Sequence, residues 1–151
     1  MQRLPVLIAV LGLVAVPAFA QDDDPIAARK ALMRNNSAAA AVANAIIKDE
    51  IAYSPVVGRA AIAAWAATAQ TITAFFPEGS ADPATSRALP KIWEDLPAFL
   101  AAVEAFRTDV AAAVEASGRD GPPDKAAFVA AAEPVLGNCG ACHDVWRAPA
   151  N

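Results

Sequence analysis

Reactive side chains are scarce in this sequence of 151 residues, which holds one histidine, one tyrosine and two cysteines. It contains no Ser–His–Asp set, no carboxylate pair and no glycine-rich phosphate loop. The side-chain sets that acid–base and nucleophilic catalysis require are therefore missing. We expect a protein that is not a substrate-transforming enzyme.

Clusters of basic residues are also absent, and the formal net charge is −4 at pH 7. Nucleic-acid binding depends on a basic surface, so nucleic acid is excluded as a partner. Aromatic residues make up only 7%, whereas alanine, the strongest helix former, accounts for 41 of the 151 residues. With 56% hydrophobic residues, the composition predicts an all-α domain with a sizeable core and disfavours a β-sandwich.

Residues 1–20 have the pattern of a secretory signal peptide. Arg3 supplies the positive charge, residues 4–16 form the apolar stretch, and Ala-Phe-Ala at 18–20 is a small-x-small cleavage site. The apolar stretch is shorter than the ~20 residues that a spanning helix needs. We expect cleavage after Ala20, a mature domain at 21–151 with no membrane span, and a location in the bacterial periplasm.

Four segments of the mature chain show helical periodicity and together predict an antiparallel four-helix bundle. Cap and stop residues place the helices at about 25–47, 55–76, 96–117 and 124–146, with a loop at about 77–94. Arg29 and Met33 share the inward face of the first helix, and Val114 belongs to the inward stripe of the third. Pro134 removes a backbone hydrogen bond inside the fourth helix, so we expect a kink or a broken turn there.

Both cysteines and the only histidine fall within Cys139-Gly140-Ala141-Cys142-His143, the C-x-x-C-H pattern of covalent haem attachment. On a helix, positions i, i+3 and i+4 share one face. Two thiols can then reach the two vinyl groups of one porphyrin while the imidazole reaches the iron. We therefore predict one haem c, bound through two thioethers on the last helix.

Three other uses of these residues compete with haem attachment. A structural zinc site needs four ligands, and the chain offers two thiols and one imidazole. A thioredoxin-like dithiol would lie at a helix N-terminus beside a βαβ unit, whereas this pair lies near the end of a helix. A disulfide between Cys139 and Cys142 stays chemically possible in the periplasm, but it leaves His143 without a role.

No methionine follows the motif, which excludes the arrangement of class I cytochromes c. The chain instead resembles class II, the cytochrome c' family of periplasmic four-helix bundles with haem on the last helix. The segments that carry the likeness are Arg-Lys-Ala-Leu-Met at 29–33, Phe-Pro-Glu-Gly at 76–79, Lys-Ile-Trp at 91–93 and the motif with the following Asp-Val-Trp-Arg at 139–147. They extend over essentially the whole mature chain.

The resemblance implies a role for each matching residue. Cys139 and Cys142 form the thioethers, and His143 is the proximal iron ligand. Arg147 is similar to the basic residue beside the proximal histidine, and Arg29 to the first-helix arginine that pairs with a haem propionate.

Met33 occupies the position that faces the distal side of the iron in this family. In one branch a methionine there coordinates iron and gives a six-coordinate, low-spin electron carrier. In the other branch the residue only blocks the site, and five-coordinate iron binds nitric oxide or other small gases. Met33 is the only methionine of residues 21–151, and Leu-Met-Arg-Asn-Asn at 32–36 is more similar to the Met-ligated branch. We expect His/Met ligation and electron transfer, with gas binding as the alternative.

The resemblance also implies partners. An electron carrier docks transiently on periplasmic redox proteins rather than on a small substrate. A homodimer through the first two helices is implied as well, with the alanine-rich face at 38–41 as its contact surface.

Covalent attachment is directly testable. Because thioether bonds survive denaturation, we expect the pigment to stay with the polypeptide in denaturing gels and in acid–acetone extraction. The Cys142→Ala variant should keep at most one thioether. Free haem released from the wild type by the extraction would contradict the prediction.

Overall fold

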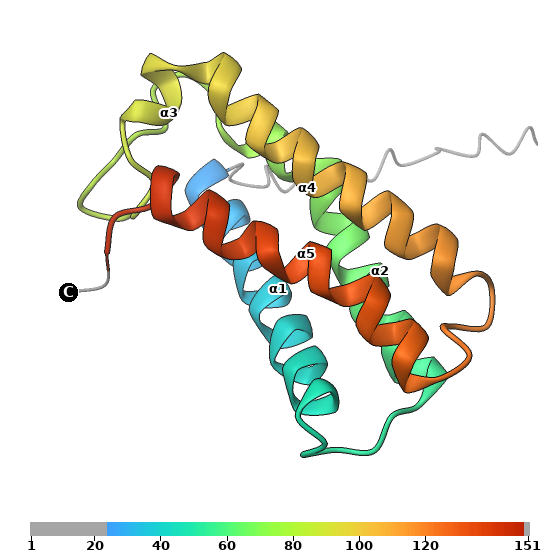
Figure 1. The fold of residues 1–151 in the computed structure, drawn as a ribbon. Coiled ribbons are helices and arrows are strands. Elements are labelled where there is room, and N and C mark those ends of the chain that lie inside the picture. Colours follow the sequence, from blue (N-terminus) through green and yellow to red (C-terminus); the bar gives the residue numbers. More distant parts are fainter. Residues whose placement is uncertain (1–23, 150–151) are drawn as a thin grey trace, which may run out of the picture.

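The computed structural model describes residues 24–149, and the signal sequence and cleavage site predicted at 1–20 lie outside them. The described part is helical, without named strands (Figure 1). Its elements are the α-helices α1 (Pro25–Ile47), α2 (Pro55–Thr71), α3 (Lys91–Glu94), α4 (Leu96–Ser117) and α5 (Lys125–Trp146), and the 3₁₀ helix η1 (Ile72–Phe75).

The four long helices form the predicted antiparallel bundle (Figure 1). Neighbouring helices pack in the order α1, α2, α4, α5, and α5 contacts α4 far more extensively than it contacts α1. The bundle is therefore closed on three sides and more loosely closed between its first and last helices. Within residues 24–149, no helix is both long and apolar enough to cross a membrane.

Side-chain caps explain where three of the helices begin. Asp24 accepts a hydrogen bond from the amide of Ile26 at 2.8 Å, and Pro25 fills the first turn of α1. Asp95 caps α4 through the amide of Ala98 at 3.2 Å, and Asp124 caps α5 through that of Ala127 at 2.8 Å. The caps at Asp24 and Asp95 agree with the sequence prediction, whereas Ser54, predicted to cap α2, makes no capping hydrogen bond through its side chain.

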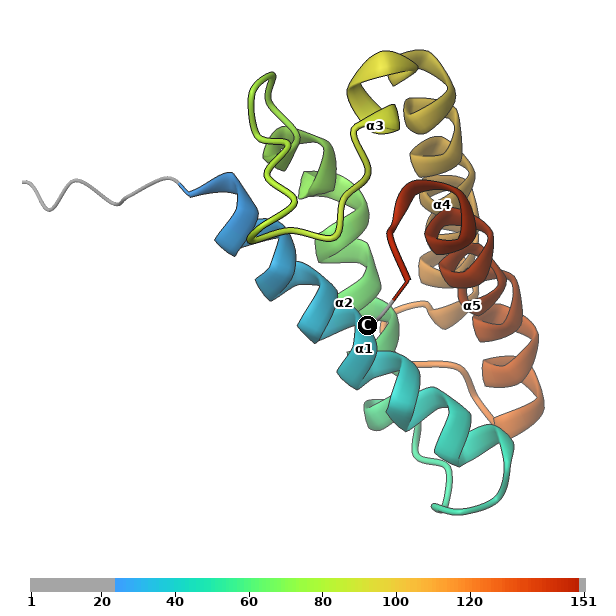
Figure 2. The ribbon, with the colours of Figure 1, turned by 90° about the vertical axis from the view of Figure 1, so that its left-hand side faces the viewer.

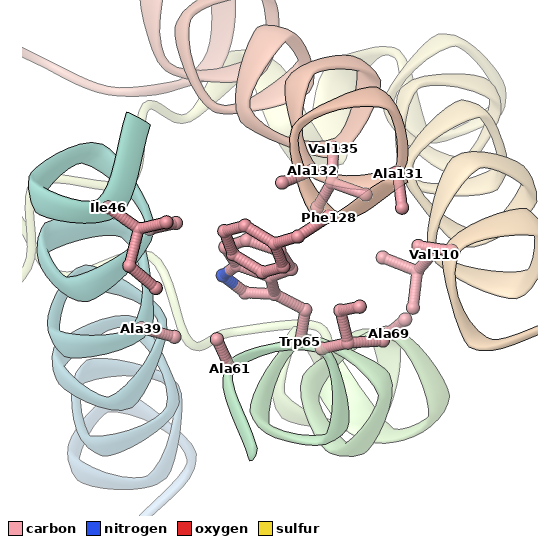
Figure 3. Close-up of a cluster of buried hydrophobic side chains, with 13 residues drawn as sticks. Ala39, Ile46, Ala61, Trp65, Ala69, Val110, Phe128, Ala131, Ala132 and Val135 are labelled. Atoms are coloured by element: carbon pink, nitrogen blue, oxygen red, sulfur yellow. The ribbon is translucent and has the colours of Figure 1, made fainter. Parts of the chain in front are cut away.

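A hydrophobic core fills the half of the bundle away from the C-terminus (Figure 3). Trp65 of α2 and Phe128 of α5 are its largest fully buried side chains, and Ile46 of α1 packs with them. Most of the remaining core residues are alanines and valines. Small residues let helix backbones approach closely, so two large rings suffice to fill this half.

Two sequence predictions about the helices are wrong. Residues 91–94, predicted as loop, form α3, because Pro90 starts the turn and Ile92 is buried against the core. Val114, predicted to face inward, is 45% exposed. Ala113 and Ser117 are buried in its place, because α4 turns a neighbouring stripe toward the bundle.

The predicted end of the second helix also needs correction, since the α-helix stops at Thr71 and continues as the tighter helix η1.

A broken turn at Pro134 is likewise wrong, because α5 runs from Lys125 to Trp146 without interruption. Pro134 and Ala130 are both exposed, so water can solvate the carbonyl that loses its intrahelical donor. The Asn138 side chain also donates to the carbonyl of Pro134 at 2.9 Å. The helix therefore tolerates the proline on its solvent side.

The turn before α5 generates a stability prediction. Gly121 has a φ of 98°, and a Cβ there would lie 2.1 Å from the carbonyl oxygen of Pro55. Gly79 has a φ of 80° but would place a Cβ in open space. We expect Gly79→Ala to lower the free energy of unfolding by about 1 kcal/mol and Gly121→Ala by about 3 kcal/mol or more, because strain and a backbone clash add at Gly121. Urea unfolding of the two variants checks this, and equal losses would contradict it.

Candidate functional site

A second apolar cluster lies at the end of the bundle where α1 begins and α5 ends (Figure 1). Its buried members are Ile72, Ile92, Phe99, Val103 and Trp146. Aromatic rings dominate it, with ring centroids 4.8 Å apart for Phe76 and Phe99 and 5.7 Å apart for Phe99 and Trp146. Cys142 of α5 and Met33 of α1 both pack against this cluster.

The two thiols lie one turn apart on α5, and both are free and half-buried. Cys139 Sγ contacts the carbonyl oxygen of Val135 at 3.8 Å. Burial raises the pKa of both thiols, and for Cys142 the neighbouring Cys139 raises it further against the opposing charge of Arg147. In the folded chain both groups are therefore protonated at neutral pH.

His143 lies next to Cys142 on the same side of α5 and is half-buried. Burial lowers the pKa of its imidazole, the positive charges of Arg147 and Arg87 lower it further, and Asp144 acts in the opposite direction. The imidazole is then neutral at pH 7 and keeps a lone pair, the form in which histidine binds metals.

Met33 lies on α1 four residues after Arg29, and its half-buried side chain belongs to the apolar cluster that Cys142 also joins. The predicted distal residue and the predicted attachment motif are thus brought to the same end of the bundle from opposite helices. Leu32 contacts the same cluster.

Arg29 is only 4% exposed, and the loop after η1 holds its guanidinium. Nη1 donates to the carbonyl oxygen of Phe75 and to Ser80 Oγ, and Nη2 donates to the Ser80 carbonyl oxygen at 2.7 Å and to Ser86 Oγ at 3.0 Å. The guanidinium carbon also lies 5.0 Å from the centre of the Phe76 ring. Burial lowers the pKa of Arg29, opposed by the charge of Asp24. The contact with a propionate stays a prediction.

Arg147 directly follows α5 and is exposed. Its amide donates to the carbonyl of His143 at 3.2 Å, one turn back, and its backbone forms an antiparallel bridge with Ala88. Sequence reasoning missed the residues that make this part of the site, Ser80, Ser86 and Arg87. They lie in a loop without periodicity, so no local pattern indicates their partners.

The donor set fits haem better than a bare metal ion. Within residues 24–149, no group of three or more His, Cys, Asp and Glu side chains could hold an ion. A porphyrin brings four nitrogen ligands of its own, so one imidazole and a second axial donor complete the coordination. Two unoxidised thiols and an aromatic, apolar surround at this site suit covalent attachment of such a group.

Comparison with known proteins gives the family to which the chain belongs. The family model described as Cytochrome C' matches residues 24–147, and the chain belongs to this family. Members carry covalently attached haem c, so the protein is a c-type cytochrome with haem c, as the motif predicted.

Individual relatives are similar in sequence to most of the chain. Cytochrome c' of Rhodopseudomonas palustris is 37% identical over 142 residues, which cover 92% of this chain and 93% of that protein. Cytochrome c-556 of Agrobacterium tumefaciens is 33% identical over 121 residues, covering 80% and 91%. The solved structure of the R. palustris cytochrome c' matches with a TM-score of 0.74 at 33% identity, covering 85% of this chain and 98% of that chain.

The buried guanidinium of Arg29 generates a prediction. Arg29→Met leaves the carbonyl oxygens of Phe75 and Ser80 without their donor, so we expect the holoprotein to lose about 3 kcal/mol of unfolding free energy. Arg59→Met removes an exposed arginine with one hydrogen bond to a carbonyl and should cost less than about 0.5 kcal/mol. Urea unfolding measures both, and similar losses would show that the loop does not depend on Arg29.

Proposed function

We propose that the protein is a periplasmic electron carrier with one haem c whose iron is ligated by His143 and Met33. Cys139 and Cys142 would hold the porphyrin through thioethers, and His143 would supply the proximal nitrogen. Met33 would supply the distal thioether sulfur.

One observation carries the proposal: Met33 packs in the same apolar cluster as Cys142, although the two residues come from opposite ends of the sequence. α1 and α5 make fewer contacts with each other than the other neighbouring helices of the bundle do, so packing constrains the side chains between them less. A methionine has three rotatable bonds and adapts its reach, which favours coordination from this position.

The proposed ligand pair suits electron transfer. Bound haem supplies an iron centre that alternates between the ferric and ferrous states. A soft thioether raises the reduction potential relative to weaker or absent axial donors. The rings of Phe76, Phe99 and Trp146 belong to the apolar cluster against which Met33 and Cys142 pack, so part of the surroundings of these two side chains is apolar.

Location and partners follow the same proposal. We infer export through residues 1–20 and encounter with other redox proteins in the periplasm. Such encounters are brief and bury little surface, and they require no substrate pocket. The chain has one histidine, and committing it to iron leaves no acid–base group of that kind for catalysis.

A homodimer through α1 and α2 is part of the proposal. A shallow apolar groove between these helices is lined by Ala38, Ala39, Val42, Val57 and Ala60 among others. Ala38 and Ala39 of the face predicted at 38–41 line this groove, in which a second copy would bury apolar area.

Ligation by Met33 is tested by spin state. We expect the ferric protein to be low-spin, to show the weak near-infrared charge-transfer band of methionine coordination, and to bind carbon monoxide poorly when reduced. Met33→Ala should make the iron high-spin and lower the reduction potential, because the sulfur that favours the ferrous state is gone.

Leu32→Ala is the matched control, since Leu32 precedes Met33 in the same cluster but has no donor atom. This variant should stay low-spin. A wild type that is already high-spin and binds carbon monoxide readily would reject the proposal in favour of gas binding.

A further inference from the structure

We propose that Arg87 is a positioning residue of the iron site, because it ties the chain after His143 to a strap that also holds the helix of Met33. The strap is defined here as residues 80–91. The inference rests on the proposed function for the roles of Met33 and His143. No motif or periodicity in the sequence indicates this positioning role of Arg87.

The first half of the strap is fastened to α1. Arg29, one turn before Met33, donates to Ser80 and to Ser86. Ser86 Oγ in turn accepts a hydrogen bond from the amide of Ala88 at 3.2 Å. Lys30 of α1 adds a bond from its Nζ to the carbonyl of Thr85 at 3.1 Å.

The second half of the strap is fastened to the chain that follows α5. Arg87 Nε and Nη2 both donate to the carbonyl oxygen of Ala148, the Nε bond at 2.8 Å. The amide of Ala148 returns a bond to the carbonyl of Arg87 at 2.8 Å, and the amide of Leu89 donates to the carbonyl of Trp146 at 3.1 Å. Figure 2 shows the C-terminal segment running alongside the strap, with α1 on its other side.

The strap therefore links the two helices that bear the proposed ligands. α1 and α5 make few direct contacts, whereas the sequence of bonds from Arg29 through Ser86 and Arg87 to Ala148 is continuous. His143 lies one turn before Arg147, whose amide binds its carbonyl, so a shift of residues 147–148 moves the last turn of α5. A ligand set has to be held within about 0.5 Å of its working geometry, so such a shift would weaken the bond from His143 to iron.

The fork of Arg87, rather than its charge, is the feature that the inference needs. Two N–H groups of the planar guanidinium donate to one carbonyl oxygen, and a lysine ammonium cannot reproduce this fixed two-donor geometry. Arg87→Lys keeps the charge and loses the fork, whereas Arg87→Gln loses both.

Arg59 provides the matched control. It is also an exposed arginine that donates to a backbone carbonyl, that of Arg119 at 3.2 Å, but it lies at the opposite end of the bundle. Arg59→Lys should leave the iron site unchanged.

The experiment uses the holoprotein and two readouts: hydrogen exchange of the Leu89 and Ala148 amides by NMR, and the high-spin fraction of the ferric iron. In Arg87→Lys and Arg87→Gln, we expect both amides to exchange about tenfold faster than in the wild type, with a larger high-spin fraction and easier binding of carbon monoxide. The Arg59→Lys protein should match the wild type in every measurement.

Three results would overturn the inference. The first is that the Leu89 and Ala148 amides of Arg87→Gln exchange at the wild-type rate. The second is that Arg87→Lys matches the wild type in both exchange rate and high-spin fraction. The third is that the amides exchange faster but the high-spin fraction stays the same. A wild type that is itself high-spin contradicts the proposed function instead. In that case only the exchange rates test the role of Arg87 in the strap, and rates unchanged in both Arg87 variants would contradict that role.

Discussion

The buried charge of Arg29 is the constraint on which the site end of the molecule depends. A guanidinium removed from water needs a hydrogen-bond acceptor for its donors, and here the loop after η1 supplies carbonyl and hydroxyl oxygens. To reach the guanidinium, the loop folds back over the start of α1 and brings Phe76 against it. Phe76 also packs against the apolar cluster that Met33 and Cys142 contact, so the loop joins Arg29 to that cluster.

The two halves of the bundle are packed with different kinds of side chains. Away from the C-terminus, Trp65 and Phe128 pack between alanine-rich helices (Figure 3). At the other end the buried cluster is Ile72, Ile92, Phe99, Val103 and Trp146, without a buried alanine, and the half-buried side chains of Cys142 and Met33 pack against it. The two sulfur-bearing side chains that the site argument uses thus lie where the packing does not depend on alanine.

Local patterns were predictable from the sequence, and long-range contacts were not. Caps such as Asp24 and Asp95 act within one turn, and the spacing of Cys139, Cys142 and His143 is a property of one helix, so the bundle and the motif are predictable from the sequence. The strap at 80–91 depends on partners about 50 or 60 positions away in the sequence. The unbroken helix at Pro134 is not predictable for a related reason, because the energetic cost of the proline depends on whether its neighbours face water.

The raised pKa values of the two thiols bear on how readily each sulfur can react. Thioether formation with a vinyl group calls for an accessible and reactive sulfur, and burial in the folded chain without haem favours the less reactive thiol form of Cys139 and Cys142. An open chain keeps these groups hydrated and closer to their ordinary acidity. The same two side chains are therefore better nucleophiles in the open chain than in the folded one.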